Sequence, residues 1–92
     1  MFVIFGKLWT DKNGNTYHTA KVWVNGEYVG QTNIAYGYGN QYLETAAELL
    51  REKGYIPEKE KMPFGFSYWC RENSIKLITD YAYVATKKEV QA

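Results

Sequence analysis

The sequence is poor in the residues on which most small-protein chemistry depends. Its 92 residues include one cysteine, Cys70, and one histidine, His18. A single cysteine excludes an intramolecular disulfide and a cysteine-based zinc site, and it fits a reducing cytoplasm. The apolar start, Met1–Phe5, is too short for a signal peptide or a membrane span. We therefore expect one soluble, cytoplasmic domain over residues 1–92, with no membrane partner.

An excess of charge of one sign is also missing. Eleven Lys and Arg residues face ten Asp and Glu residues, which leaves a net charge of +1. This balance argues against an electrostatically driven nucleic-acid binder and against an acidic mimic of DNA. Aromatic side chains, by contrast, are abundant, with nine Tyr, four Phe and three Trp. In so short a chain, some of these rings are expected on the surface or against another molecule.

Two Asn-Gly pairs predict an antiparallel meander of three strands. Lys12–Asn15 and Asn25–Gly26 each separate two β-prone runs, and Asn-Gly is the preferred pair for a two-residue type I′ turn. With such turns, Trp9 lies opposite His18. A bulge at Gly14 would shift this register by one residue and invert the faces of the strand. Neither face is purely apolar, so we expect a helix on one, and a C-terminal segment, another subunit or a ligand on the other.

The one well-patterned helix is expected over residues 40–53. Asn40 is a good N-cap, and Gly54 is a strong stop signal. Glu44 and Glu48 share its outer face, which we interpret as solvated rather than as a metal-nuclease pair. The apolar stripe of this helix consists of Leu43, Ala46, Ala47, Leu49 and Leu50.

The rest of the chain is expected to add one strand. Residues 57–63 form a charged connector that we expect to be mobile or loosely packed, and residues 66–71 fit either a short helix or a strand. Residues 74–84 are the best remaining strand, and the tail, 87–92, is expected to be frayed. The order β-β-β-α-β predicts an α+β two-layer sandwich with one main helix packed on the sheet.

The search for catalytic chemistry favours a protein that is not an enzyme. We interpret His18 as a half-buried cross-strand partner of Trp9, with a catalytic or ligand-binding imidazole as the alternative. One histidine and scattered carboxylates offer no metal site, and we expect no cofactor. Cys70 is expected to pack as a small apolar residue.

The run YGYGNQY, Tyr36–Tyr42, alternates rings with glycines and leads directly into the helix. It fits either a tight strand-to-helix corner or a recognition surface in which rings, open backbone and helix N–H groups meet a ligand. On the second interpretation, the ring-bearing and polar residues of this run and of the nearby sheet would contact the partner. These candidates are Tyr36, Tyr38, Asn40, Gln41, Tyr42, His18, Trp9 and Lys21.

Four motifs in this order resemble those of a group of small uncharacterised bacteriophage proteins. They are GNTYH (14–18), Asn25–Gly26, YGYGNQY and Lys87-Lys88-Glu89, and the likeness covers most of the chain outside 57–63. The resemblance implies a viral or prophage setting, expression inside a bacterial host and a small accessory role. It carries no functional residues.

The leading hypothesis is therefore a non-enzymatic phage-type binding protein that sequesters or blocks a host component. That component would be a host protein or a small nucleotide ligand, and one such role is inhibition of host anti-phage defence. A homo-oligomer is compatible with this role. The alternative is a small nucleic-acid-binding module that uses the three-stranded sheet with basic and aromatic residues.

Overall fold

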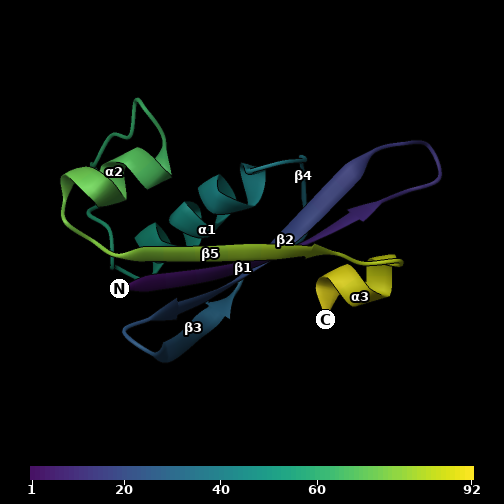
Figure 1. Ribbon diagram of the computed structural model, residues 1–92, viewed down its shortest axis with the longest axis horizontal. Coiled ribbons are helices and arrows are strands. Elements are labelled where there is room, and N and C mark those ends of the chain that lie inside the picture. Colours follow the sequence, from purple (N-terminus) through teal and green to yellow (C-terminus); the bar gives the residue numbers. More distant parts are fainter.

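The computed structural model describes residues 1–92 and shows a mixed five-stranded sheet with helices on both faces (Figure 1). The order across the sheet is β3-β2-β1-β5, and β4 also pairs with β2. Helices α1 and α2 lie on one face, which we call the covered face, and α3 lies against part of the other, the open face. The elements are β1 (Phe2–Thr10), β2 (Thr16–Val24), β3 (Glu27–Gln31), β4 (Ala35–Tyr36), α1 (Gln41–Glu52), α2 (Phe66–Glu72), β5 (Leu77–Tyr83) and α3 (Lys87–Gln91).

The α+β class is confirmed, but the three-stranded antiparallel meander is only part of the sheet. β5, expected over residues 74–84, lies next to β1 and runs parallel to it, which makes the sheet mixed. β4 adds a short antiparallel pairing in which Tyr17 lies opposite Tyr36. The three strands of the predicted meander are present, but the meander leaves out the other strands of the sheet. The sequence pattern does not reveal which edge of a sheet a distant strand joins.

The first hairpin turns through more than two residues, and this shifts its register. Trp9 lies opposite Tyr17 rather than His18. Gly14 has a φ of +83°, and its N–H donates to the carbonyl of Asp11 (3.1 Å). The predicted pairing of Trp9 with His18 is therefore wrong by one residue, and the shift is the one expected from the alternative of a bulge at Gly14. The side chains of β1 consequently point to the opposite faces from those expected for a two-residue turn.

The second hairpin has the predicted two-residue turn. Asn25 and Gly26 both have positive φ, +49° and +87°, as a type I′ turn requires. Trp23 lies opposite Tyr28 next to this turn. The register then shifts between Val22 and Trp23, so β3 carries a bulge before it ends.

Helix α1 lies within a residue of its predicted limits and packs on the covered face. Its C-terminus is a Schellman motif: Gly54 has a φ of +85°, and Tyr55 N–H donates to the carbonyl of Leu50 (2.9 Å). The N-terminal prediction is wrong in one respect, because the side chain of Asn40 makes no capping hydrogen bond. The residues that α1 buries are Tyr42, Leu43, Ala46, Ala47 and Leu50.

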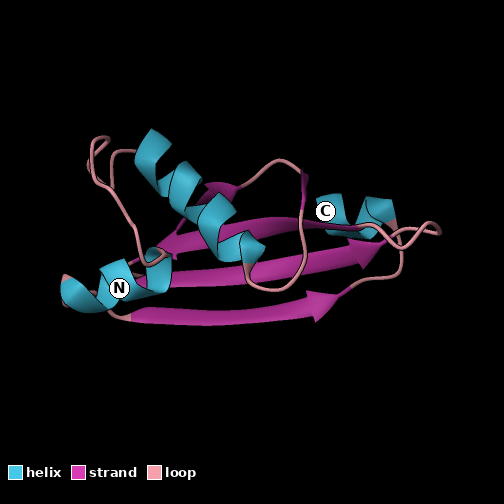
Figure 2. Ribbon diagram, turned by 90° about the horizontal axis from the view of Figure 1, so that it is seen from above, coloured by secondary structure: helices cyan, strands magenta, loops and turns pink.

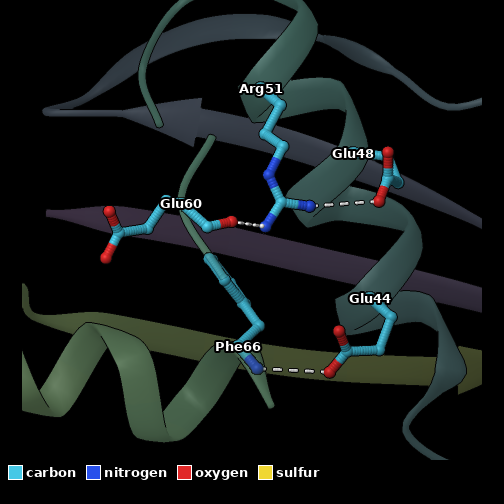
Figure 3. Close-up of polar contacts among 5 residues, drawn as sticks. All are labelled: Glu44, Glu48, Arg51, Glu60 and Phe66. Atoms are coloured by element: carbon cyan, nitrogen blue, oxygen red, sulfur yellow. Dashed lines mark hydrogen bonds and ion pairs between the residues drawn. The ribbon is translucent and has the colours of Figure 1, made fainter. Parts of the chain in front are cut away.

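The connector between α1 and α2 is anchored, in contrast to the mobile segment expected for residues 57–63. Arg51 donates from one guanidinium nitrogen to the carbonyl of Glu60 (2.8 Å) (Figure 3). Trp69 Nε1 donates to Glu60 Oε1 (2.8 Å). Ile56, just before this segment, is fully buried. Residues 66–71 form a helix, α2, whose Phe66 N–H donates to Glu44 Oε1 (3.2 Å).

The tail is the clearest departure from expectation, because residues 87–91 form a helix rather than a frayed end. Thr86 caps it: its Oγ1 accepts from Glu89 N–H (3.1 Å). Val90 is fully buried against the open face of the sheet, and Lys7 Nζ and Thr19 Oγ1 donate to the carbonyls of Glu89 and Val90. The C-terminal segment therefore covers part of the second face of the sheet, which was one of the alternatives expected from the sequence.

The core lies between the covered face and helices α1 and α2. Large apolar side chains of β1 and β2 meet those of both helices there. Separately, none of the helices is long and apolar enough to cross a bilayer. The core residues are Phe2, Ile4, Leu8, Ala20, Val22, Val24, Tyr42, Leu43, Ala46, Ala47, Leu50, Ile56, Phe66, Trp69 and Cys70.

Candidate functional site

Three aromatic rings from three strands meet at one end of the open face. Trp9 of β1 and Tyr17 of β2 are directly opposite each other, and their rings stack with centroids 5.6 Å apart and planes 28° apart. Tyr36 of β4 lies opposite Tyr17 and meets it edge-on, at 5.6 Å and 73°. We call Trp9, Tyr17 and Tyr36 the aromatic arc. Its first two rings stack on each other, and the third meets Tyr17 edge-on.

The aromatic arc borders a hollow of about 360 Å³. Ile34 adds an apolar side chain to its lining, and Asp11 and Lys87 add one charge of each sign. Asp11 Oδ1 is already committed, since it accepts from the backbone N–H groups of Asn13 and Asn15 (2.9 Å each). This combination can stack a planar ring and offer an ammonium group to an anion attached to that ring.

The aromatic arc contains only two of the predicted contact residues. Trp9 and Tyr36 belong to the aromatic arc, and Tyr36 is 65% exposed. Tyr38 is 74% exposed in the corner before α1, outside the arc. Asn40 and Gln41 are also exposed at that corner.

Tyr42 and His18 are buried, so neither can serve as a contact residue in this structure. Tyr42 is 2% exposed and lies over Gly6, where a Cβ atom would come within 2.6 Å of the Tyr42 ring. Burial also raises the pKa of the Tyr42 hydroxyl. The prediction that Tyr42 contacts a partner is therefore replaced by a packing role: the missing side chain of Gly6 makes room for its ring.

His18 binds the corner to helix α1 instead of facing a ligand. Its Nδ1 lies 3.0 Å from the carbonyl oxygen of Gly37, and its Nε2 lies 2.6 Å from Thr45 Oγ1. A carbonyl can only accept, so Nδ1 carries a proton. Thr45 Oγ1, the partner of Nε2, also lies 3.2 Å from the carbonyl oxygen of Gln41, to which it can donate. Both ring nitrogens are used within the fold, and the half-buried pairing with Trp9 is replaced by this buried bridge.

Lys21 lies on the open face away from the aromatic arc, near Lys7. Burial, followed by the charge of Lys21, lowers the pKa of the Lys7 ammonium. Lys7 Nζ donates to the carbonyl of Glu89 at the end of α3 (3.2 Å). Lys7 therefore serves the docking of α3, and Lys87 is the cation beside the rings.

The largest hollow, about 870 Å³, lies elsewhere and is entirely charged or polar. Its lining includes Glu48, Arg51 and Glu60, and Arg51 pairs with Glu48 (3.2 Å) (Figure 3). Glu44, outside this hollow, accepts from α2. Glu44 and Glu48 thus have separate partners rather than a shared ligand. No group of three or more His, Cys, Asp or Glu residues is placed to hold a metal ion.

The residues that sequence reasoning missed are Tyr17, Ile34 and Lys87. Tyr17 would have been found from the correct register of the first hairpin, which sets it opposite Trp9. The motif Lys87-Lys88-Glu89 gave no indication that Lys87 lies beside the rings, because it reaches them only through the docking of α3. No family model, curated protein or solved structure matches the chain.

Proposed function

We propose that this protein is a non-enzymatic binding protein whose aromatic arc holds a small nucleotide ligand. The observation that carries the proposal is the meeting of Trp9, Tyr17 and Tyr36 beside Lys87 at one hollow. Ring faces bind any flat base, and a neighbouring ammonium group favours a base that carries phosphate. The chain's one imidazole is fully engaged inside the fold, so the proposal is retention of the ligand rather than its conversion.

The proposed pose sets each part of the ligand against a lining residue of matching chemistry. The base stacks on a free face of the Trp9 and Tyr17 ring pair, next to Tyr36. The phosphate is directed towards Lys87, and Asp11 Oδ2 accepts from a sugar hydroxyl or an exocyclic amine. Stacking on aromatic side chains is worth about 1–3 kcal/mol per base, which gives modest affinity from this surface alone.

Within the bacteriophage setting implied by the sequence motifs, retention of a host nucleotide has a clear use. A small protein made in quantity inside a bacterial cell would lower the free concentration of that nucleotide and block the host component that depends on it. Inhibition of a nucleotide-dependent anti-phage defence is one such role. A host protein that inserts a side chain between the same rings is the competing occupant.

Calorimetric titration with adenosine monophosphate, adenosine and a short oligothymidylate tests the proposal. We expect the monophosphate to bind more tightly than the nucleoside, and Trp9→Ala or Tyr36→Ala to weaken binding by about tenfold or more. Tyr38→Ala is the matched control, because Tyr38 is an exposed tyrosine of the same segment outside the arc.

Three results would contradict the proposal. The first is no heat of binding with any of these probes, and the second is an equal loss of affinity in the Tyr36 and Tyr38 variants. The third is binding of the oligothymidylate alone with an affinity that falls steeply with salt, which would favour the nucleic-acid-binding module instead.

A further inference from the structure

β5 is an open edge of the sheet. It is the outermost strand in the order β3-β2-β1-β5, and Figure 2 shows no helix beyond it. Six of its seven residues, Ile78–Tyr83, are exposed, and they contain no lysine, proline or glycine. Long, regular edge strands without such protection readily accept a further strand.

The other edge of the sheet is protected in two ways. β3 has five residues and a register shift opposite Val22 and Trp23, and β4 has only two residues. Short and bulged strands are how soluble proteins prevent edge-to-edge pairing. Of the two edges of the sheet, β5 is therefore the one that lacks protection against pairing with a further strand.

The backbone groups of β5 that face outwards can be assigned from its pairing with β1. Phe2 N–H donates to the carbonyl of Lys76, and Val84 N–H donates to the carbonyl of Leu8. The even-numbered residues of β5 therefore bond to β1, and the odd-numbered residues, including Leu77 and Thr79, direct their N–H and C=O groups away from the sheet.

We propose that β5 pairs antiparallel with β5 of a second copy of the chain, with Ile78 on the two-fold axis. In this register Leu77 lies opposite Thr79 of the second copy, and these outward-facing residues exchange both of their backbone hydrogen bonds. Lys76 lies opposite Asp80 of the second copy, and symmetry gives the same pair twice. The charge complementarity of these positions selects this register over the one centred on Asp80, in which two aspartates would meet.

An apolar hollow on the open face supports the same arrangement. It measures about 430 Å³ and is lined by Val3, Phe5, Trp23 and Ile78, with Asp80 at its margin. Ile78 is 42% exposed. The two-fold axis would bring the Ile78 side chains of both copies into contact on this face and join the two hollows into one continuous apolar surface.

The present partner of Asp80 can be exchanged without leaving a polar group unpaired. In the single chain its Oδ1 accepts from the N–H of Tyr81 (2.8 Å), so this outward-facing N–H of the edge strand already has a partner. In the pair, Asp80 turns to Lys76 of the second copy. The N–H of Tyr81 then meets the carbonyl of Ile75 of the second copy, the next outward-facing residue in this register.

Sedimentation velocity and native mass spectrometry of the purified chain test the pairing. We expect a concentration-dependent dimer that Lys76→Glu weakens by about tenfold or more, because it turns two attractive pairs into two repulsive ones. Asp80→Lys should have the same effect, and the double variant K76E/D80K should restore the dimer. Lys53→Glu, the same charge change at an exposed site distant from β5, should leave association unchanged.

The double variant makes the test specific to this register. A chain that stays monomeric at all concentrations overturns the proposal. So does a dimer that persists equally in K76E and in Ile78→Lys, or one that the K76E/D80K variant fails to restore. Far-ultraviolet circular dichroism of each variant ensures that a loss of association is not a loss of the fold.

Discussion

At the scale of single residues, the fold depends on side chains that occupy the space left by the missing Cβ atoms of glycines. Gly6 is the clearest case, because its missing Cβ atom provides the space for the ring of Tyr42. Gly37 has the same relation to Gln41, whose Cγ would lie 2.8 Å from an added Cβ. Neither fit is visible in the sequence, since each joins residues from different elements. This is why Tyr42 resembled a contact residue and proved to be part of the core.

Gly6→Ala should therefore destabilise the protein by about 1–3 kcal/mol in urea unfolding, because the added methyl group overlaps the Tyr42 ring. The control is the same change in a Tyr42→Leu background, where the smaller side chain leaves room. We expect the cost of Gly6→Ala to fall by about 1 kcal/mol or more in that background. Equal costs in the two backgrounds would show that the two residues are not coupled.

Cys70 makes a second prediction at this scale. Burial raises the pKa of its thiol from 9.0 to about 11, so the folded state favours the protonated form more than the unfolded chain does. This group's contribution to stability is complete below pH 9 and is lost as the pH rises towards 11. The folded protein should also resist alkylation by iodoacetamide at neutral pH. Rapid labelling without unfolding would contradict this burial.

At the scale of elements, local signals predicted what local interactions decide. The type I′ turn at Asn25–Gly26, the span of α1 and its stop at Gly54 are all confirmed, because each depends on backbone preferences within a few residues. The predicted register of the first hairpin was wrong because the loop between Thr10 and Thr16 is longer than a two-residue turn. The parallel placement of β5 and the docking of α3 depend on contacts across the whole chain, which no local pattern encodes.

Gly14 should determine the first register. Its φ of +83° is disfavoured for residues with a Cβ atom, so Gly14→Ala should cost about 1 kcal/mol, while Gly14→Asn should cost less because Asn tolerates this conformation. Equilibrium urea unfolding of the two variants gives the comparison. The conformation of this turn would be in question if Ala and Asn proved equally tolerated there.

Docking of α3 should depend on Val90. Val90→Ala removes buried apolar surface worth about 1–2 kcal/mol, so hydrogen exchange of the α3 amides should become roughly tenfold faster. Exchange in the central strand β2 should change much less, and the exposed Lys88→Ala variant serves as the control. Unchanged protection of α3 in the Val90 variant would mean that other contacts hold this helix.

At the scale of the whole molecule, the open face carries three distinct features along its length. The aromatic arc lies at one end, α3 packs beyond it, and the apolar hollow lies beside β5. The sequence indicated a surplus of rings and two partly apolar faces, but it could not locate the surface. Trp9 and Tyr17 become neighbours through the register of the first hairpin, and Tyr36 joins them through the pairing of β4 with β2.

A ¹H–¹⁵N NMR titration of the chain with adenosine monophosphate tests the central claim most directly, because it reports where a ligand contacts the protein. We predict that the largest shift changes fall on the indole N–H of Trp9 and on the backbone amides of Tyr17, Tyr36 and Lys87. The amide of Tyr38 and the indole N–H groups of Trp23 and Trp69 should change little. Shift changes centred on any other surface, or none at saturating ligand, would contradict the assignment of the aromatic arc as the binding site.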